Sequence, residues 1–75
     1  MTPDPILRDR LIDRASQIAR DRGWTWRDPV EVTAELFGGQ AAWMIQTNVG
    51  MLGTNIRIAF RQSDGELIGA AYLPR

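Results

Sequence analysis

Apolar and polar residues divide the chain into one helical segment followed by strand-like segments. At about 100° per residue, the apolar residues of segment 5–22 gather in one arc of a helical wheel. They are Leu7, Leu11, Ile12, Ala15, Ile18 and Ala19. Asp4 and Pro5 fit an N-cap and a first helical position, and Gly23 fits a left-handed C-terminal cap. The pattern therefore predicts an amphipathic helix over residues 5–22.

Beyond this helix, apolar residues recur at every second position, which is typical of strands with one buried face. The alternation predicts strands at 30–37, 41–47, 55–62 and 66–73. Gly38-Gly39 predicts a turn between the first two, and Asp64-Gly65 predicts a hairpin between the last two. The fold class expected is α+β, in one domain (1–75): one N-terminal amphipathic helix packed on a four-stranded antiparallel β-meander.

The turn at residues 64–65 also predicts the register of the last hairpin. A two-residue turn places Phe60 opposite Gly69 and Ile58 opposite Ala71, whereas a longer turn would exchange the two faces of the last strand. The helix stripe is then expected to pack on Val30, Val32, Leu36, Trp43, Ile45, Ile56, Ile58 and Phe60. The open sheet face is expected to show Glu31, Glu35, Arg57 and Arg61 around Met44, Ile68, Ala70 and Tyr72.

Composition removes most enzyme classes. The chain has no Cys, no His and no Lys, so a His general base, a thiolate, a Schiff-base amine and the usual zinc ligands are missing. The acidic residues lack the spacing of a calcium loop. Glu31 and Glu35 could form a catalytic carboxylate pair, but their strand positions favour cross-strand pairing with arginines. We expect no enzymatic activity, no cofactor and no bound metal.

Charge and hydropathy indicate how the chain meets its surroundings. Nine arginines balance nine acidic residues, and the arginines of the helix alternate with aspartates, which favours a solvated face over a nucleic-acid surface. No run approaches the ~20 apolar residues of a membrane span. No signal peptide is visible near the start. We expect a cytoplasmic protein that binds neither nucleic acid nor membrane.

Two segments are candidates for partner binding. Trp24 and Trp26 would point the same way on an extended segment, either closing one end of the core or anchoring a partner. The segment 48–55 brackets Met51 and Leu52 with glycines, so it is either the packed tip of a hairpin or a binding loop. Together with Met44, Ile68 and Tyr72 of the open face, these four residues are the predicted partner-binding residues.

The order of elements resembles the PepSY and cystatin-like small α+β modules. The residues that carry this likeness of architecture are Val30-Glu31-Val32, Trp43-Met44-Ile45, Ile56-Arg57-Ile58-Ala59-Phe60 and Asp64-Gly65-Glu66-Leu67-Ile68. The resemblance implies a protein-binding or peptidase-inhibiting unit. The same order also resembles small bacterial toxin-immunity proteins, which would be cytoplasmic binding proteins.

Two functions from different classes follow from these observations. The first is a small non-catalytic protein-binding module, inhibitory or regulatory, that uses the open sheet face and the 48–55 loop. The second is a structural homo-oligomer formed through the open face without a separate ligand. An enzyme would need residues from elsewhere or a cofactor.

Overall fold

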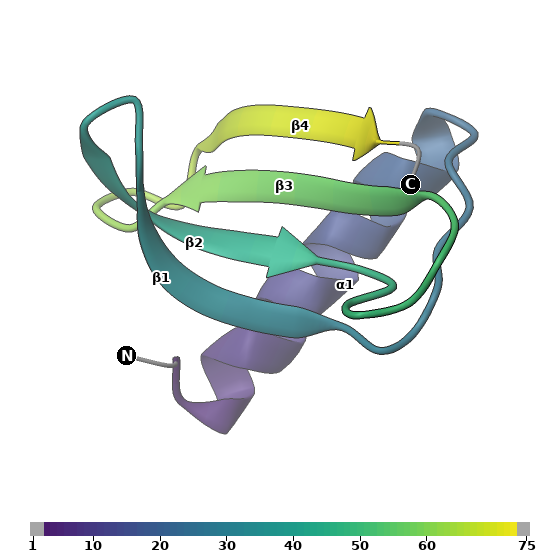
Figure 1. Ribbon diagram of the computed structural model, residues 1–75. Helices are drawn as coiled ribbons and strands as arrows, with labels where there is room; N and C mark the ends of the chain where they lie inside the picture. The colour runs from purple at the N-terminus through teal and green to yellow at the C-terminus, as the bar shows by residue number, and fades with distance from the viewer. Residues whose placement is uncertain (1–2, 74–75) are drawn as a thin grey trace.

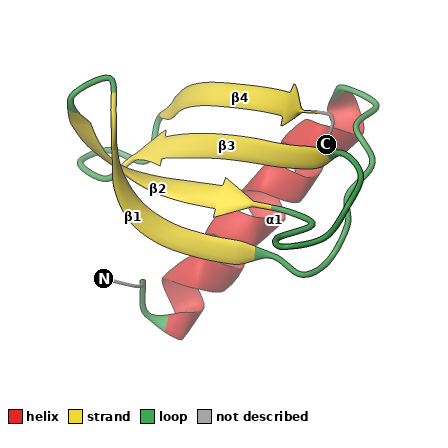
Figure 2. Cartoon of the chain, viewed as in Figure 1, coloured by secondary structure: helices red, strands yellow, loops and turns green. Residues whose placement is uncertain are grey.

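Helix α1 (Pro5–Asp21) crosses one face of a four-stranded antiparallel sheet in the computed structural model, which describes residues 3–73 (Figure 1). The strands follow the chain in the order β1-β2-β3-β4. Their bounds are β1 (Glu31–Phe37), β2 (Gln40–Gln46), β3 (Asn55–Arg61) and β4 (Leu67–Leu73). Figure 2 shows the helix on one side of the sheet only. The predicted α+β fold, one helix on an antiparallel meander, is confirmed.

The caps of α1 are those that the sequence predicts. The Asp4 carboxylate accepts a hydrogen bond from the Leu7 amide at 3.0 Å, and Pro5 takes the first helical position, where no amide is needed. At the other end Gly23 has a positive φ of 72°, and the Trp24 amide donates to the Ala19 carbonyl at 2.8 Å. The helix therefore begins and ends through local chemistry.

The core lies between α1 and the sheet. Leu11, Ala15 and Ala19 of the helix are buried, and small alanines let the helix approach the strands closely. Their buried partners on the sheet are Val32, Ile45, Ile56, Ile58 and Phe60. Arg14 links the helix to β3 and to the β3–β4 turn. Its guanidinium lies 4.3 Å from the Phe60 ring centroid, and its Nη1 donates a hydrogen bond to the Gly65 carbonyl at 2.7 Å.

Leu36 departs from the predicted core. Its side chain is 77% exposed, although it alternates correctly with buried Val32. Figure 1 shows the reason, because the β1–β2 hairpin curls away from α1 and carries the end of β1 out of the reach of the helix. The prediction that Leu36 lies in the core is therefore wrong.

The predicted register of β3 and β4 is also wrong. Phe60 pairs with Leu67 and Ala59 pairs with Gly69, so Ile68 is an extra residue that forms a β-bulge. From Gly69 onward each residue of β4 therefore faces the side opposite to the predicted one. Ala70 and Tyr72 join the core under the helix, while Gly69, Ala71 and Leu73 lie on the open face.

Candidate partner-binding face

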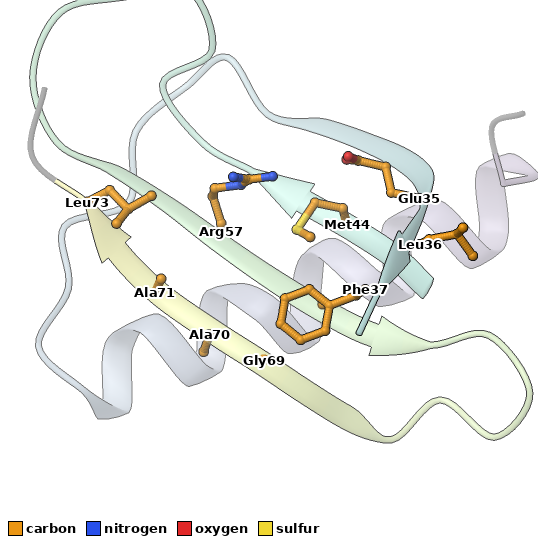
Figure 3. A pocket seen from close by; sticks show the side chains of 10 residues that line it. Glu35, Leu36, Phe37, Met44, Arg57, Gly69, Ala70, Ala71 and Leu73 are labelled. Atoms are coloured by element: carbon orange, nitrogen blue, oxygen red, sulfur yellow. The ribbon is translucent and has the colours of Figure 1, made fainter. Parts of the chain in front are cut away.

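The face of the sheet that α1 leaves uncovered contains a pocket of about 300 Å³. The pocket extends from the curled end of β1 across β2 and β3 to β4, and the residues that shape it are Phe37, Met44, Arg57, Ala59, Gly69 and Ala71. Figure 3 shows Phe37 lying across the sheet toward Gly69, with Arg57 and Met44 standing on the same side. The pocket combines an apolar floor with one cation, Arg57, and one carboxylate, Glu35, on its β1 side.

Phe37 forms one wall of this pocket because β4 has a glycine beneath it. A Cβ built on Gly69 would collide with the Phe37 ring, so only a glycine allows this close contact. The sequence predicts Phe60 opposite Gly69, whereas in the structure the aromatic ring over this glycine is that of Phe37, from the far edge of the sheet. The sequence signal was present, since Phe37 immediately precedes the Gly38-Gly39 turn and shares a face with Glu35.

The open face has a small apolar cluster of its own. Ala42, Met44 and Ala59 are buried there, and Ile68 packs against them. Met44 and Ile68 thus lie on the face that the sequence predicts. Met44 is only 4% exposed, so it serves as the floor of the face rather than as a projecting contact.

Tyr72 and Ala70 are corrections to the predicted open face. The bulge at Ile68 turns both toward the helix, where the Tyr72 ring stacks on Trp24 with centroids 5.6 Å apart and 8° between planes. The Tyr72 hydroxyl lies 3.1 Å from the Thr54 hydroxyl, and this hydrogen bond is the main cause that lowers the pKa of Tyr72. Tyr72 therefore belongs to the core side of the sheet.

Trp24 and Trp26 close the same end of the core. Both are partly buried and pack against the core residues, which is the first of the two roles that the sequence allowed. The Arg22 guanidinium lies 5.2 Å from the Trp24 ring centroid, and the Tyr72 ring stacks on the same tryptophan. This cation–aromatic stack completes the end of the core, so neither tryptophan projects from the surface as an anchor.

Arg57 is the cation of the pocket. It lies in one cross-strand row with Gln46 of β2 and Ala71 of β4. Its Nε is buried without a hydrogen-bond partner, and no carboxylate within residues 3–73 lies close enough to form an ion pair with it. A buried donor without a partner costs free energy, which an incoming acceptor would recover. Arg57 is therefore the residue of this face best placed to meet an anion.

Arg61, four residues further along β3, is already neutralised. Its Nη1 lies 2.8 Å from the Asp64 carboxylate and 2.9 Å from the Glu66 carboxylate, and its Nε donates to the Gln40 side chain. The Glu66 backbone amide, and then Arg61, hold the pKa of Asp64 below its ordinary value. Asp64 and Glu66 thus both pair with the arginine that precedes their turn.

Glu31 and Glu35 do not follow that pattern. The Glu35 carboxylate accepts a hydrogen bond from the Thr33 hydroxyl at 2.8 Å, and within residues 3–73 neither glutamate forms an ion pair with an arginine. Both lie on β1, whose register places them beside Ala42 and Gln46 of β2 instead of beside a cation. Their predicted pairing with arginines is therefore wrong.

The loop between β2 and β3 is organised around Asn48. This residue is 3% exposed with φ at 53°, and its Nδ2 donates to the carbonyl oxygens of Leu52 and Thr54, each at 3.0 Å. The backbone amide of Asn48 donates to the Arg27 carbonyl. At the tip, Leu52 is 90% exposed and Met51 55% exposed. Sequence reasoning missed Asn48, although a buried asparagine is a usual scaffold for a left-handed loop position.

The loop and the pocket lie at adjoining parts of the sheet. The loop enters β3 at Asn55, which pairs with Leu73, and Leu73 lines the pocket. The predicted residues thus fall into two groups. Met51, Leu52, Met44 and Ile68 lie on the loop tip or the open face, while Trp24, Trp26 and Tyr72 lie in the core layer.

Metal sites, membrane-spanning helices and similarity to known proteins also bear on the function of the chain. Within residues 3–73, no three potential metal-binding side chains lie close together. Within the same residues, no helix has the length and apolar character needed to cross a membrane. Comparisons with protein-family models, with curated proteins and with solved structures found no match for this chain. The functional argument therefore depends on the geometry of the face itself.

Proposed function

We propose that this protein is a small non-catalytic binding module that holds a segment of a partner protein on its open sheet face. The observation that carries this proposal is the pocket of about 300 Å³ between Phe37 and Arg57. Pockets that bind ligands combine an apolar lining with a few oriented polar groups. Here the apolar lining includes Met44, Ala59 and Ala71, and the charged groups are Arg57 and, on β1, Glu35, which accepts a hydrogen bond from Thr33.

The loop at 48–54 supports the same proposal. Leu52 stands 90% exposed on a loop that Asn48 holds in shape, so its apolar side chain is presented to solvent by an ordered scaffold. An exposed apolar residue on a loop that leads into β3 adds to the apolar area that a partner can cover. An inhibitory or regulatory role, in the manner of PepSY and cystatin-like modules, fits a chain that binds without catalysing.

A substitution that fills the pocket with a large side chain tests the proposal, because it should prevent peptide binding. Peptides displayed on phage are selected against the native chain, and the enriched peptides are then titrated into two variants. Ala71→Trp fills the pocket from β4, whereas Gln17→Trp adds the same side chain to the exposed face of α1. We expect Ala71→Trp to abolish binding and Gln17→Trp to leave it unchanged, with both variants folded by circular dichroism. Equal binding to both variants contradicts the proposal.

A second candidate function is a structural homo-oligomer. The observation that favours it is the outer strand β4, which has no charged residue from Leu67 to Leu73. Native edge strands are usually protected against self-pairing by charges, and this strand has only the bulge at Ile68. Sedimentation distinguishes this candidate from a module that binds a separate partner.

A further inference from the structure

The free edge of β4 offers backbone hydrogen bonds next to the pocket. Within residues 3–73, β4 pairs with β3 alone, and Figure 1 shows no other element beside its outer edge. An extended segment can add to such an edge as a further strand, gaining affinity from the main chain and specificity from side-chain pockets. The residues that separate this edge from the pocket are Gly69 and Ala71, which have little or no side chain.

The register fixes which side chains an added strand would bring to the pocket. Ala71 lies in the row of Arg57, so a residue beside Ala71 can reach the guanidinium over a single methyl group. Gly69 lies under the Phe37 ring, so a residue beside Gly69 meets an aromatic wall. Gly69 and Ala71 are two residues apart, which is about 6.5–7 Å along a strand and equals the spacing of same-face residues in any extended segment.

We infer that the segment bound at this edge is an extended stretch of the partner protein with an apolar residue two positions from a glutamate. The apolar side chain lies beside Gly69 against Phe37, and the carboxylate lies beside Ala71 and accepts hydrogen bonds from Arg57. This inference rests on the proposed function and names the chemistry of its partner. A glutamate is preferred to an aspartate because the carboxylate must extend across Ala71.

Charge supports this assignment. Arg61 already has two carboxylates, so Arg57 is the cation of the open face that lacks one within residues 3–73. A guanidinium beside apolar walls is poorly hydrated, and a charge-assisted hydrogen bond is stronger there than in open water. Glu35 lines the pocket on the β1 side, whereas β4, where the segment would pair, has no charged residue that would repel an acidic strand.

Synthetic peptides test the inference directly. The first is an acetylated and amidated threonine-rich peptide of about seven residues, a usual strand length, with Leu and Glu two positions apart. The second has Gln in place of Glu, and the third has Gln together with a free C-terminal carboxylate. We expect the Glu peptide to bind the native chain about tenfold more tightly than either other peptide, which equals about 1.4 kcal/mol. Isothermal titration measures all three.

Two protein variants locate the effect. Arg57→Gln should bind the Glu and Gln peptides equally, while Arg20→Gln, which removes an exposed cation of α1, should keep the preference. N-methylation of the peptide amides that face β4 should abolish binding, and N-methylation of the outward amides should not. Melting temperatures of both variants show whether the fold is retained.

Several results overturn the inference. The inference is wrong if the Glu and Gln peptides bind the native chain with equal affinity, or if Arg57→Gln still prefers the Glu peptide. It is also wrong if the peptide with the free C-terminal carboxylate binds as tightly as the Glu peptide, or if N-methylation of the peptide amides that face β4 leaves binding unchanged. A β4 edge occupied by a second copy of the chain, seen as peptide-resistant dimers in sedimentation, overturns it as well. A different result separates the two proposals. If the displayed peptides bind the native chain but not Ala71→Trp, and if their binding does not depend on an acidic residue, the proposed function is supported and only this inference is wrong.

Discussion

At the scale of single residues, two arginines of β3 show how context decides what a charge does. Arg57 and Arg61 occupy the same face of β3 and lie four residues apart. Arg61 contacts Asp64 and Glu66, which belong to the adjoining turn, and so it stabilises the hairpin. Arg57 lies mid-strand beside Gln46 and Ala71, out of reach of that turn. One charge is therefore structural, and the other remains available to a partner.

The turn acid gives a pH-dependent prediction. The pKa of Asp64 is lowered in the folded chain, so the folded state binds fewer protons than the unfolded state in acid. Its contribution is therefore present above the ordinary aspartate pKa and is lost as pH falls from there through the lower folded pKa. Asp64→Asn should lower the melting temperature at neutral pH and have no effect in strong acid. An equal effect at both pH values would contradict the assignment.

A pair of β3 residues tests the two faces of the sheet. Ile58 is fully buried beneath α1, so Ile58→Ala should cost about 2–5 kcal/mol, a large share of the stability of a small domain. Arg57→Ala should cost far less, because its Nε makes no hydrogen bond that could be lost. Urea denaturation measures both. Similar losses would show that Arg57 is a structural residue.

At the scale of elements, the β1–β2 hairpin is linked to β4 through Phe37 and Gly69. Gly69→Ala forces a methyl group into the ring and should destabilise the fold by about 1–3 kcal/mol. In a Phe37→Ala background the same change should become neutral or stabilising, because alanine suits a strand better than glycine. A double-mutant cycle in urea gives the coupling. Additive effects would mean that the two residues do not touch.

The loop between β2 and β3 gives a second prediction at this scale. Because Leu52 is 90% exposed, replacing Met51 and Leu52 together by serine should change the free energy of unfolding by less than about 0.5 kcal/mol. Binding of the selected peptides should weaken. Melting temperature and peptide affinity are measured on one sample. A clear loss of stability with unchanged affinity would show that the loop tip only packs.

The elements also show where sequence reasoning succeeds and where it stops. The caps of α1 and the four strands follow from local patterns, because Asp4, Pro5 and Gly23 act on their own neighbours. The faces of β4 do not, because every residue of Leu67–Leu73 is apolar or glycine and no alternation marks the bulge. The pocket depends on that bulge and on the curl that brings Phe37 over Gly69. Both are products of packing between distant strands.

At the scale of the whole molecule, zero net charge and an uncharged outer strand favour association. If copies associate through the open face, sedimentation at micromolar concentration should show species larger than a monomer. Ile68→Glu, which places a charge in the open-face cluster, should then reduce them. Leu73→Glu is the companion variant, because Leu73 is 39% exposed and tolerates a charge more easily. A native chain that sediments as a monomer at every concentration removes the homo-oligomer.

The contact between Arg14 and Gly65 spans 51 positions of the chain. During synthesis α1 leaves the ribosome before the strands that cover its apolar stripe, and the turn that Arg14 contacts follows β3. A nascent chain therefore exposes Leu11 and its neighbours until β3 and the final turn have emerged. During that interval the apolar stripe of α1 is accessible to chaperones that recognise apolar segments.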